Sequence, residues 1–241
     1  SIVINRNQKS KNHALNPDLL IHQIYDIFSK LSQQFNEKYE EIITEDSYAT
    51  VQSVIYKHCG FCLEKRKSNV ESAGLGVFVK NGRLPKHVVV AFYPGTIYRP
   101  GEAAFLQSLG NKFVLRCIDG TLIDGNDRGL SKLVFKSCTL RDRMGKNLLN
   151  DMTWLTELPA NPLAVGQYVN NAASEEESNV FYEEVDFPVS FLNVNERRFL
   201  PNVLYANTRD CDRMRTVVLI SNREIEKDEE LKSNYLTLFQ A

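Results

Sequence analysis

Apolar residues near the start of the chain recur with the spacing of one face of a helix. They stand at Leu20, Ile24, Phe28, Leu31 and Phe35. Gaps of three or four residues predict an amphipathic helix that packs one side against the rest of the protein. Asn16 is expected to cap this helix and Pro17 to begin it. A second helix is expected over about residues 47–58, and the two together are expected to form an extension packed on the main domain.

From about Ser68 the pattern changes to short runs rich in β-branched and aromatic residues. These runs read GVFV, HVVVAFY, NKFVLRCI, TLI, NVFYEEVDF, NVLYA and RTVVLIS. Turn signals separate them, and Asp119-Gly120 between two runs predicts a β-hairpin. Strands and helices do not alternate as they do in a doubly wound parallel sheet. The sequence therefore predicts an α+β protein, mostly β, made of several small sheets with few helices, one of them near residues 161–171.

The overall composition is that of a globular domain with ample material for a core. The chain has 241 residues, 43% of them hydrophobic, and a net charge of −1. It lacks the basic excess expected of a nucleic-acid-binding protein, and no stretch approaches the ~20 apolar residues of a membrane-spanning helix. We therefore expect no direct nucleic-acid partner and no membrane partner, and we assume a monomer.

Cysteine usage suits a reducing compartment. The five cysteines are odd in number and widely spaced, unlike the framework of a secreted disulfide-rich domain. Cys59 and Cys62 form a C-x-x-C pair beside His58, but a structural zinc site needs four ligands, usually with a second such pair. The sequence holds no second pair, so we expect no metal.

Five short motifs follow one another along the second part of the chain. They are Gly74-Leu75-Gly76, Tyr93-Pro94-Gly95, Ile123-Asp124-Gly125, Asn170-Asn171 with Asn179, and Asp228-Glu229-Glu230-Leu231 with Asn234-Tyr235. Each alone has an ordinary structural explanation, such as a turn glycine or a strand-end core tyrosine. Their order, over about residues 72–235, resembles that of the SET-domain protein methyltransferases.

The resemblance implies a particular fold and domain organisation. It implies a SET-domain β-clip with a pseudoknot-like C-terminus, over residues 68–241, preceded by the helical extension over residues 1–67. A large insertion at about residues 126–160 is unusual for the family. Two interpretations of it stay open: it shapes a substrate groove, or it is a surface excursion with its own small cluster.

The resemblance also implies an activity and a cofactor. SET-domain proteins transfer a methyl group from S-adenosyl-L-methionine to a protein, so we expect methylation of a lysine-bearing tail or loop of a histone or non-histone protein, in the nucleus or the cytoplasm. The implied catalytic residues are Tyr235 and Tyr93. The implied cofactor-binding residues are Leu75, Gly76, Tyr168, Asn170, Asn171 and Tyr235. Asp124 and Glu229 are expected to have structural roles.

Departures from the family pattern keep other functions open. Asn171 stands where the family usually has histidine, and Ser178 replaces a proline. These changes allow a catalytically weak or inactive SET-fold interaction module, whereas the retained Tyr93 and Tyr235 favour an enzyme. Methylation of another side chain, such as histidine, is a third possibility that no residue selects.

Overall fold

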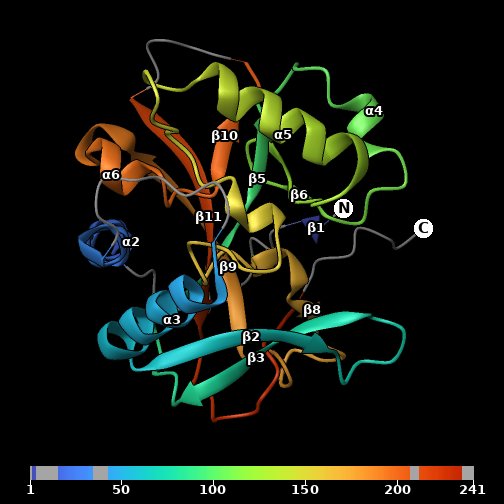
Figure 1. Ribbon diagram of the computed structural model, residues 1–241. Coiled ribbons are helices and arrows are strands. Elements are labelled where there is room, and N and C mark those ends of the chain that lie inside the picture. The colour runs from blue at the N-terminus through green and yellow to red at the C-terminus, as the bar shows by residue number, and fades with distance from the viewer. Residues whose placement is uncertain (1, 4–15, 35–42, 207–211, 235–241) are drawn as a thin grey trace.

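The computed structural model describes residues 2–3, 16–34, 43–206 and 212–234 (Figure 1). The helices are α2 (Pro17–Gln34), α3 (Glu45–Cys59), α4 (Phe105–Ser108), α5 (Gly129–Arg141) and α6 (Val194–Arg197), with 3-10 turns η1 (Thr153–Leu155), η2 (Gly166–Tyr168) and η3 (Val189–Phe191). The strands are β1 (Ile2–Val3), β2 (Phe61–Lys67), β3 (Leu75–Gly82), β4 (Val89–Tyr93), β5 (Gly95–Tyr98), β6 (Val114–Arg116), β7 (Leu122–Asp124), β8 (Asn170–Asn171), β9 (Val180–Pro188), β10 (Asn202–Leu204), β11 (Arg213–Ser221) and β12 (Lys232–Ser233). The α+β class with several small sheets is confirmed.

The described strands form three sheets, in which few neighbouring strands follow one another along the chain. Their orders are β1-β6-β7-β5-β10, β4-β11-β9-β12-β8, and β2-β3. Each apolar run singled out in the sequence contributes a strand. The Asp119-Gly120 hairpin is also confirmed, because β6 and β7 pair in antiparallel fashion and Gly120 takes the left-handed conformation with φ +90° that a tight turn needs. Among the described helices, none combines the length and the apolar character needed to cross a bilayer.

The helix expected near residues 161–171 is wrong. This segment contains the single 3-10 turn η2 and the short strand β8, because part of its backbone bonds to other strands. The carbonyl of Leu163 accepts a hydrogen bond from the amide of Phe92 at 2.8 Å, so β4 takes the bond that a helix would use internally. Gly166 allows this close approach, since a Cβ there would lie 2.7 Å from the Phe92 carbonyl oxygen.

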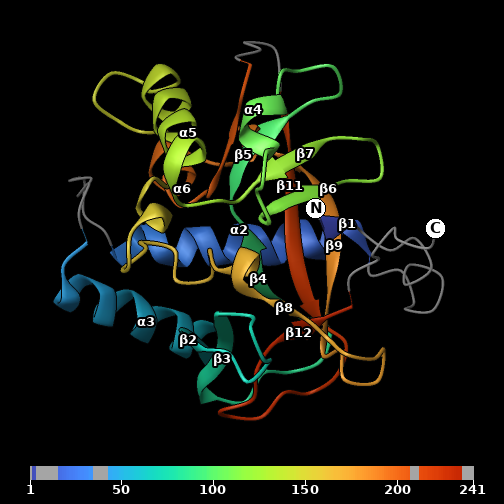
Figure 2. The same cartoon turned by 90° about the vertical axis from the view of Figure 1, so that its right-hand side faces the viewer.

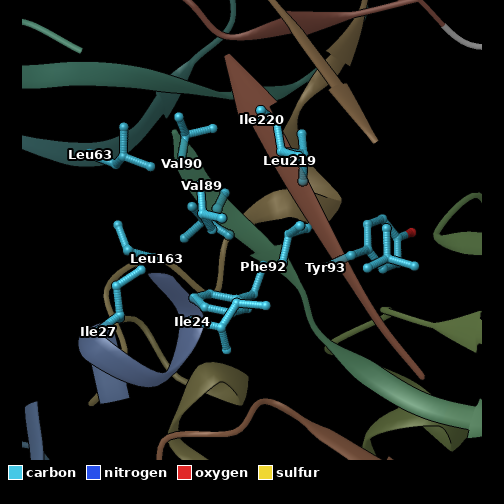
Figure 3. Packing of buried hydrophobic residues seen from close by; sticks show 14 of the residues in the cluster. Ile24, Ile27, Leu63, Val89, Val90, Phe92, Tyr93, Leu163, Leu219 and Ile220 are labelled. Atoms are coloured by element: carbon cyan, nitrogen blue, oxygen red, sulfur yellow. The ribbon is translucent and has the colours of Figure 1, made fainter. Parts of the chain in front are cut away.

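The first predicted helix forms and packs on the sheet as expected (Figure 2). Its buried side chains are Leu20, Ile24, Ile27, Phe28 and Leu31. Asn16 caps it by accepting a hydrogen bond from the amide of Asp18 at 2.9 Å. Figure 3 shows Ile24 of α2 beside Phe92 of β4, so this helix shares the main hydrophobic core with the sheet. The predicted member Phe35 lies outside the described residues.

The second helix, α3, is also confirmed, with clear signals at both ends. The Thr44 hydroxyl accepts a hydrogen bond from the amide of Ser47 at 3.2 Å, which caps the N-terminus. Gly60 ends the helix in the left-handed conformation. Both helices belong to the main core, and the proposed boundary at residue 67 stays a prediction.

The insertion contains a helix that the sequence pattern did not predict, α5. It packs against β5 and β10, and its Phe135 meets Trp154 edge-on with ring centroids 5.1 Å apart. A second, smaller hydrophobic cluster results, made of Phe135, Cys138, Trp154, Leu155, Ala164 and Val203. The insertion is thus anchored to the sheet by a core of its own.

A buried carboxyl, Asp151, organises the loop that follows α5. Its oxygens accept hydrogen bonds from the amide of Thr153 at 2.7 Å, from the Thr153 hydroxyl, and from the amide of Asn161 at 3.3 Å. Burial nevertheless raises the pKa of Asp151 to about 6, since desolvation of the charged form outweighs these bonds.

Asp151 is therefore expected to make the protein less stable as the pH rises through the window from about 4 to about 6. The folded state holds the Asp151 proton more tightly than the unfolded chain does, so raising the pH favours unfolding by up to about 3 kcal/mol. Urea denaturation between pH 4 and pH 7 measures this on the native protein and on Asp151→Asn, which cannot titrate there. The unfolding free energy of the native protein should fall relative to that of Asp151→Asn as the pH rises. A difference that does not change with pH would contradict the raised pKa of Asp151.

Candidate functional site

The last described segment, residues 225–233, runs between two other parts of the chain. On one side it pairs with β3, where the amide of Leu231 donates to the Val77 carbonyl at 2.8 Å. On the other side β12 pairs in parallel fashion with β8, and the amide of Asn179 donates to the Lys232 carbonyl at 2.9 Å. Figure 2 shows β8 and β12 side by side. This crossing brings the first, fourth and fifth motifs together.

A polar cluster forms where these motifs meet, and we define it as Ser68, Leu75, Gly76, Asn170 and Glu230. The Asn170 amide nitrogen lies 3.0 Å from the Ser68 hydroxyl, 3.0 Å from the Leu75 carbonyl oxygen and 3.1 Å from Glu230 Oε1. The Glu230 carboxylate is buried and also accepts hydrogen bonds from the Ser68 hydroxyl at 2.6 Å and the Asn69 amide at 2.9 Å. Asn170 and Glu230 thus hold the start of β3 against the crossing segment.

The two glycines of the first motif are needed for different reasons. Gly74 has φ +79°, a left-handed conformation, with open space around the position of a Cβ. Gly76 does not have this conformation, but a Cβ there would overlap Glu230 Oε1 and lie 3.2 Å from the Asn170 amide nitrogen. Gly74 therefore turns the chain, and Gly76 makes room for the buried carboxylate.

An aromatic cluster lies beyond the polar one, and we define it as Tyr93, Phe113, Tyr168 and Tyr182. The Tyr93 hydroxyl donates to the Phe113 carbonyl at 2.8 Å, and its ring meets that of Tyr182 edge-on at 6.1 Å. The Tyr168 ring meets that of Phe113 edge-on at 5.8 Å. Figure 3 shows Tyr93 turned away from Phe92, as expected of successive residues on a strand.

Tyr168 is held by charged groups on both sides. Its hydroxyl donates to Asp127 Oδ2 at 2.5 Å, and Lys65 Nζ lies 5.1 Å from the centre of its ring. Burial, together with the Asp127 carboxylate, raises the pKa of Tyr168 well above its ordinary value. The hydroxyl therefore stays protonated, and the aromatic face interacts with the positive charge of Lys65.

The structure brings five of the predicted site residues into these clusters: Leu75, Gly76 and Asn170 in the polar one, and Tyr93 and Tyr168 in the aromatic one. Asn171 is exposed and pairs with Ser233 where β8 meets β12. Tyr235 lies outside the described residues. The roles assigned to these residues, and their membership of one site, stay predictions.

Glu229 and Asp124 make the contacts of structural residues. The Glu229 carboxylate accepts hydrogen bonds from Arg223 and, at 3.1 Å, from the Asn179 amide nitrogen. Its burial favours a higher pKa, but these hydrogen bonds outweigh it and lower the pKa of Glu229, so the carboxylate stays charged. Asp124 is buried and accepts from Asn111 at 2.7 Å and from the Asn126 amide at 3.2 Å, which ties down a turn.

The candidate metal ligands have other partners. The Cys62 thiol donates to the Gln52 carbonyl at 3.2 Å, and burial raises the pKa of Cys59 to about 12, so neither favours the thiolate that metals need. Among the residues that the structure describes, Cys117, Asp119 and Glu184 also lie close together. Arg215 already pairs with both carboxylates of that group, so it supplies the positive charge a metal would bring.

Comparison with known proteins decides the family. No family model matches this chain. Over 227 residues, however, it is 42% identical to SET domain-containing protein 9 of Homo sapiens, covering 88% of this chain and 75% of that protein. The chain belongs to the SET domain-containing protein 9 family. The protein of that name from Pongo abelii is 41% identical over 227 residues, covering 88% of this chain and 82% of that protein.

Solved structures show more distant likenesses. One is ctPRC2 in an autoinhibited conformation bound to S-adenosylmethionine, with a TM-score of 0.40 and 11% identity over 72% of this chain and 15% of that chain. Another is KRYPTONITE in complex with mCHH DNA, an H3(1-15) peptide and SAH, with a TM-score of 0.37 and 15% identity over 73% of this chain and 24% of that chain. Likenesses at this level assign no function to a chain.

Several residues of the two clusters, and one residue bonded to them, were not predicted from the sequence to lie there. They are Ser68, Phe113, Asp127, Tyr182 and Glu230. Sequence reasoning weighed Glu229 of the fifth motif, whereas the buried carboxylate facing Gly76 is that of its neighbour Glu230. The pair Glu229-Glu230 was the only hint in the sequence that a glutamate lies here. Which of the two adjacent side chains faces inward depends on how residues 225–233 cross β3.

Proposed function

We propose that this protein is an S-adenosyl-L-methionine-dependent protein methyltransferase that acts on a lysine side chain. The observation that carries the proposal is the crossing of residues 225–233, which pairs with β3 and places Glu230 against Gly76 and Asn170, while Asn170 donates to the Leu75 carbonyl. Membership in a SET-domain family supports it. A histone or non-histone acceptor in the nucleus or the cytoplasm is part of the proposal.

The residues of the polar cluster fit the proposed donor. When bound, S-adenosyl-L-methionine supplies a methyl group on a positively charged sulfur and carries an amino and a carboxyl group. Leu75 is 40% exposed at the start of β3 and Asn171 is exposed on β8, so both residues lie at the surface where the polar groups of the donor are proposed to bind. The edge of the site therefore offers donors and acceptors of the required kinds.

The aromatic cluster suits a lysine acceptor. Free lysine has a pKa of ~10.4, so it must lose its proton before its nitrogen can attack. Buried aromatic surroundings favour the neutral amine, since they solvate the ammonium poorly. The Tyr93 hydroxyl donates a hydrogen bond to the Phe113 carbonyl at 2.8 Å, which fixes the position of its ring in this buried aromatic surface.

Calorimetric titration with S-adenosyl-L-methionine tests the proposal. We expect saturable one-to-one binding, and we expect Asn170→Ala to weaken it at least about tenfold, because the start of β3 loses its tie to Glu230. Tyr235→Phe serves as the comparison variant. It is expected to retain donor binding while transfer of a labelled methyl group to a protein extract falls about 100-fold.

Two results would contradict the proposal that this protein is a methyltransferase. One is no donor binding by a chain shown to be folded by its cooperative unfolding. The other is donor binding without transfer to any protein in the native chain, which would instead favour the catalytically inactive interaction module. Because binding and transfer are measured separately, the two failures are distinguishable.

A further inference from the structure

Helix α5 is apolar on two opposite faces. One face packs on the sheet, with Phe135 and Cys138 buried. The other face carries Leu130, Leu133 and Leu140, which are 46%, 65% and 46% exposed. Figure 1 shows α5 on the outside of the molecule, in front of β5 and β10. A leucine row on the outer side of a packed helix is not needed to hold the helix in place, so it is free to bind something else.

The exposed row has the spacing of a helix-packing seam. Leu130, Leu133, Ser137 and Leu140 follow one another at intervals of three, four and three residues, and we call these four residues the α5 stripe. This is the alternation by which one helix packs along another. The small Ser137 in the middle of the stripe leaves a shallow site for a large side chain of a partner helix.

Exposed apolar side chains also lie on α4. Among the described residues, seven of the twelve exposed large apolar side chains lie between residues 105 and 144, including Phe105 and Leu106 of α4. Asn111 connects the two helices, since its amide nitrogen lies 2.9 Å from the Gln107 carbonyl oxygen and 3.5 Å from the Ser131 hydroxyl. The concentration of exposed apolar groups in this one region marks a binding surface rather than scattered surface residues.

The same region is strongly basic. Residues 128–146 carry six basic side chains and one carboxylate, a net charge of +5 in a chain whose total is −1. Arg141 bonds to that carboxylate, Asp142, and Arg128 lies 3.6 Å from Asp127. None of the ion pairs found among the described residues includes Lys136, Arg143 or Lys146, and all three are exposed. These charges are therefore available to an acidic partner.

The distribution of charge around the α5 stripe indicates that its partner is a single helix and not a broad, flat surface. With 3.6 residues per turn, Lys132 and Lys136 lie along one flank of the α5 stripe. Lys132 donates to the Leu155 carbonyl at 3.1 Å and is held there. A single charged flank beside a narrow leucine row matches one helix with an acidic edge. A second copy of this chain is disfavoured, because two surfaces of charge +5 repel each other.

We propose that the α5 stripe binds an amphipathic helix of a partner protein, with large apolar residues along one face and glutamate or aspartate along the adjoining flank. This goes beyond the proposed methyltransferase activity and does not depend on it. The partner's apolar residues pack between Leu130, Leu133 and Leu140, and its carboxylates lie beside Lys136.

Fluorescence anisotropy with a labelled synthetic helix tests the proposal on the full chain. The probe carries leucine at the a and d positions of a heptad repeat and glutamate at e and g. We expect Leu133→Gln to weaken binding about tenfold, as for a central interface residue. The matched control is Leu19→Gln, an exposed leucine of α2 whose side chain is 58% exposed compared with 65% for Leu133. It is expected to leave binding unchanged.

Three outcomes would overturn the proposal. The first is equal affinity for the glutamate probe and for a probe with lysine at the same positions. The second is no binding of the glutamate probe at concentrations up to about 1 mM. The third is binding to phosphatidylserine vesicles that Leu133→Gln abolishes, with no binding of the glutamate probe, which would identify the surface as one for anionic membranes.

Discussion

Replacing Gly76 by alanine is expected to destabilise the protein by about 3–5 kcal/mol and to abolish binding of S-adenosyl-L-methionine. The added Cβ overlaps Glu230 Oε1, and the carboxylate is buried, so it cannot move aside into water. Displacing it separates a buried charge from the Ser68 hydroxyl and the Asn170 amide, which is costly. Urea denaturation measures the stability, and calorimetric titration measures donor binding.

Gly74→Ala is the matched control for this prediction. Gly74 has φ +79° and nothing near its Cβ position, so alanine there is expected to cost only about 1–2 kcal/mol of conformational strain. A double-mutant cycle adds a second check: with Glu230→Ala already present, Gly76→Ala should cost about 1 kcal/mol or less, because the overlap is gone. Two results would contradict this explanation. One is an equal loss of stability in Gly74→Ala and Gly76→Ala. The other is a double-mutant cycle in which the effects of Gly76→Ala and Glu230→Ala simply add, which would show that Glu230 is not the reason for glycine at position 76.

Phe28→Ala is expected to lower the free energy of unfolding by about 3–5 kcal/mol. Phe28 is fully buried, stacks on Phe92 with ring centroids 5.2 Å apart, and meets Phe187 edge-on at 6.2 Å. Its removal leaves a cavity between α2 and the sheet that neighbouring rigid strands cannot fill. The measurement is urea denaturation followed by circular dichroism.

Tyr25→Ala on the same helix is the comparison variant. Tyr25 is 37% exposed, so its loss is expected to cost less than about 1 kcal/mol. We also expect α2 and the sheet to unfold in one transition, because they share one core. If Phe28→Ala produced a separate early transition of the helices, the N-terminal extension would be an independent unit instead.

Much of the fold could be predicted because its signals are local. The stripe of α2, its Asn16 cap and the Asp119-Gly120 hairpin each depend on residues a few positions apart, and each formed as expected. The order of five motifs was equally readable, since order is a property of the chain alone. It indicated the SET-domain family that the 42% identity to SET domain-containing protein 9 then established.

The two failures in predicting helices have different causes. Helix α5 was not predicted because its outer face is also apolar, so the contrast that reveals an amphipathic helix is absent. The expected helix at residues 161–171 did not form because Leu163 bonds to Phe92 of a distant strand. Only in the second case did a contact between remote segments outweigh local preference.

The sequence by itself therefore determined the class of fold, its main strands, its N-terminal helices and the family. Tertiary structure alone decided which residues meet at the site, because the crossing of residues 225–233 selects the side chains that face β3. That crossing buries Glu230 rather than Glu229, gives Gly76 its steric role, and joins Asn170 to Leu75. Pairing between segments more than 90 residues apart leaves no local pattern, so only the folded chain reveals it.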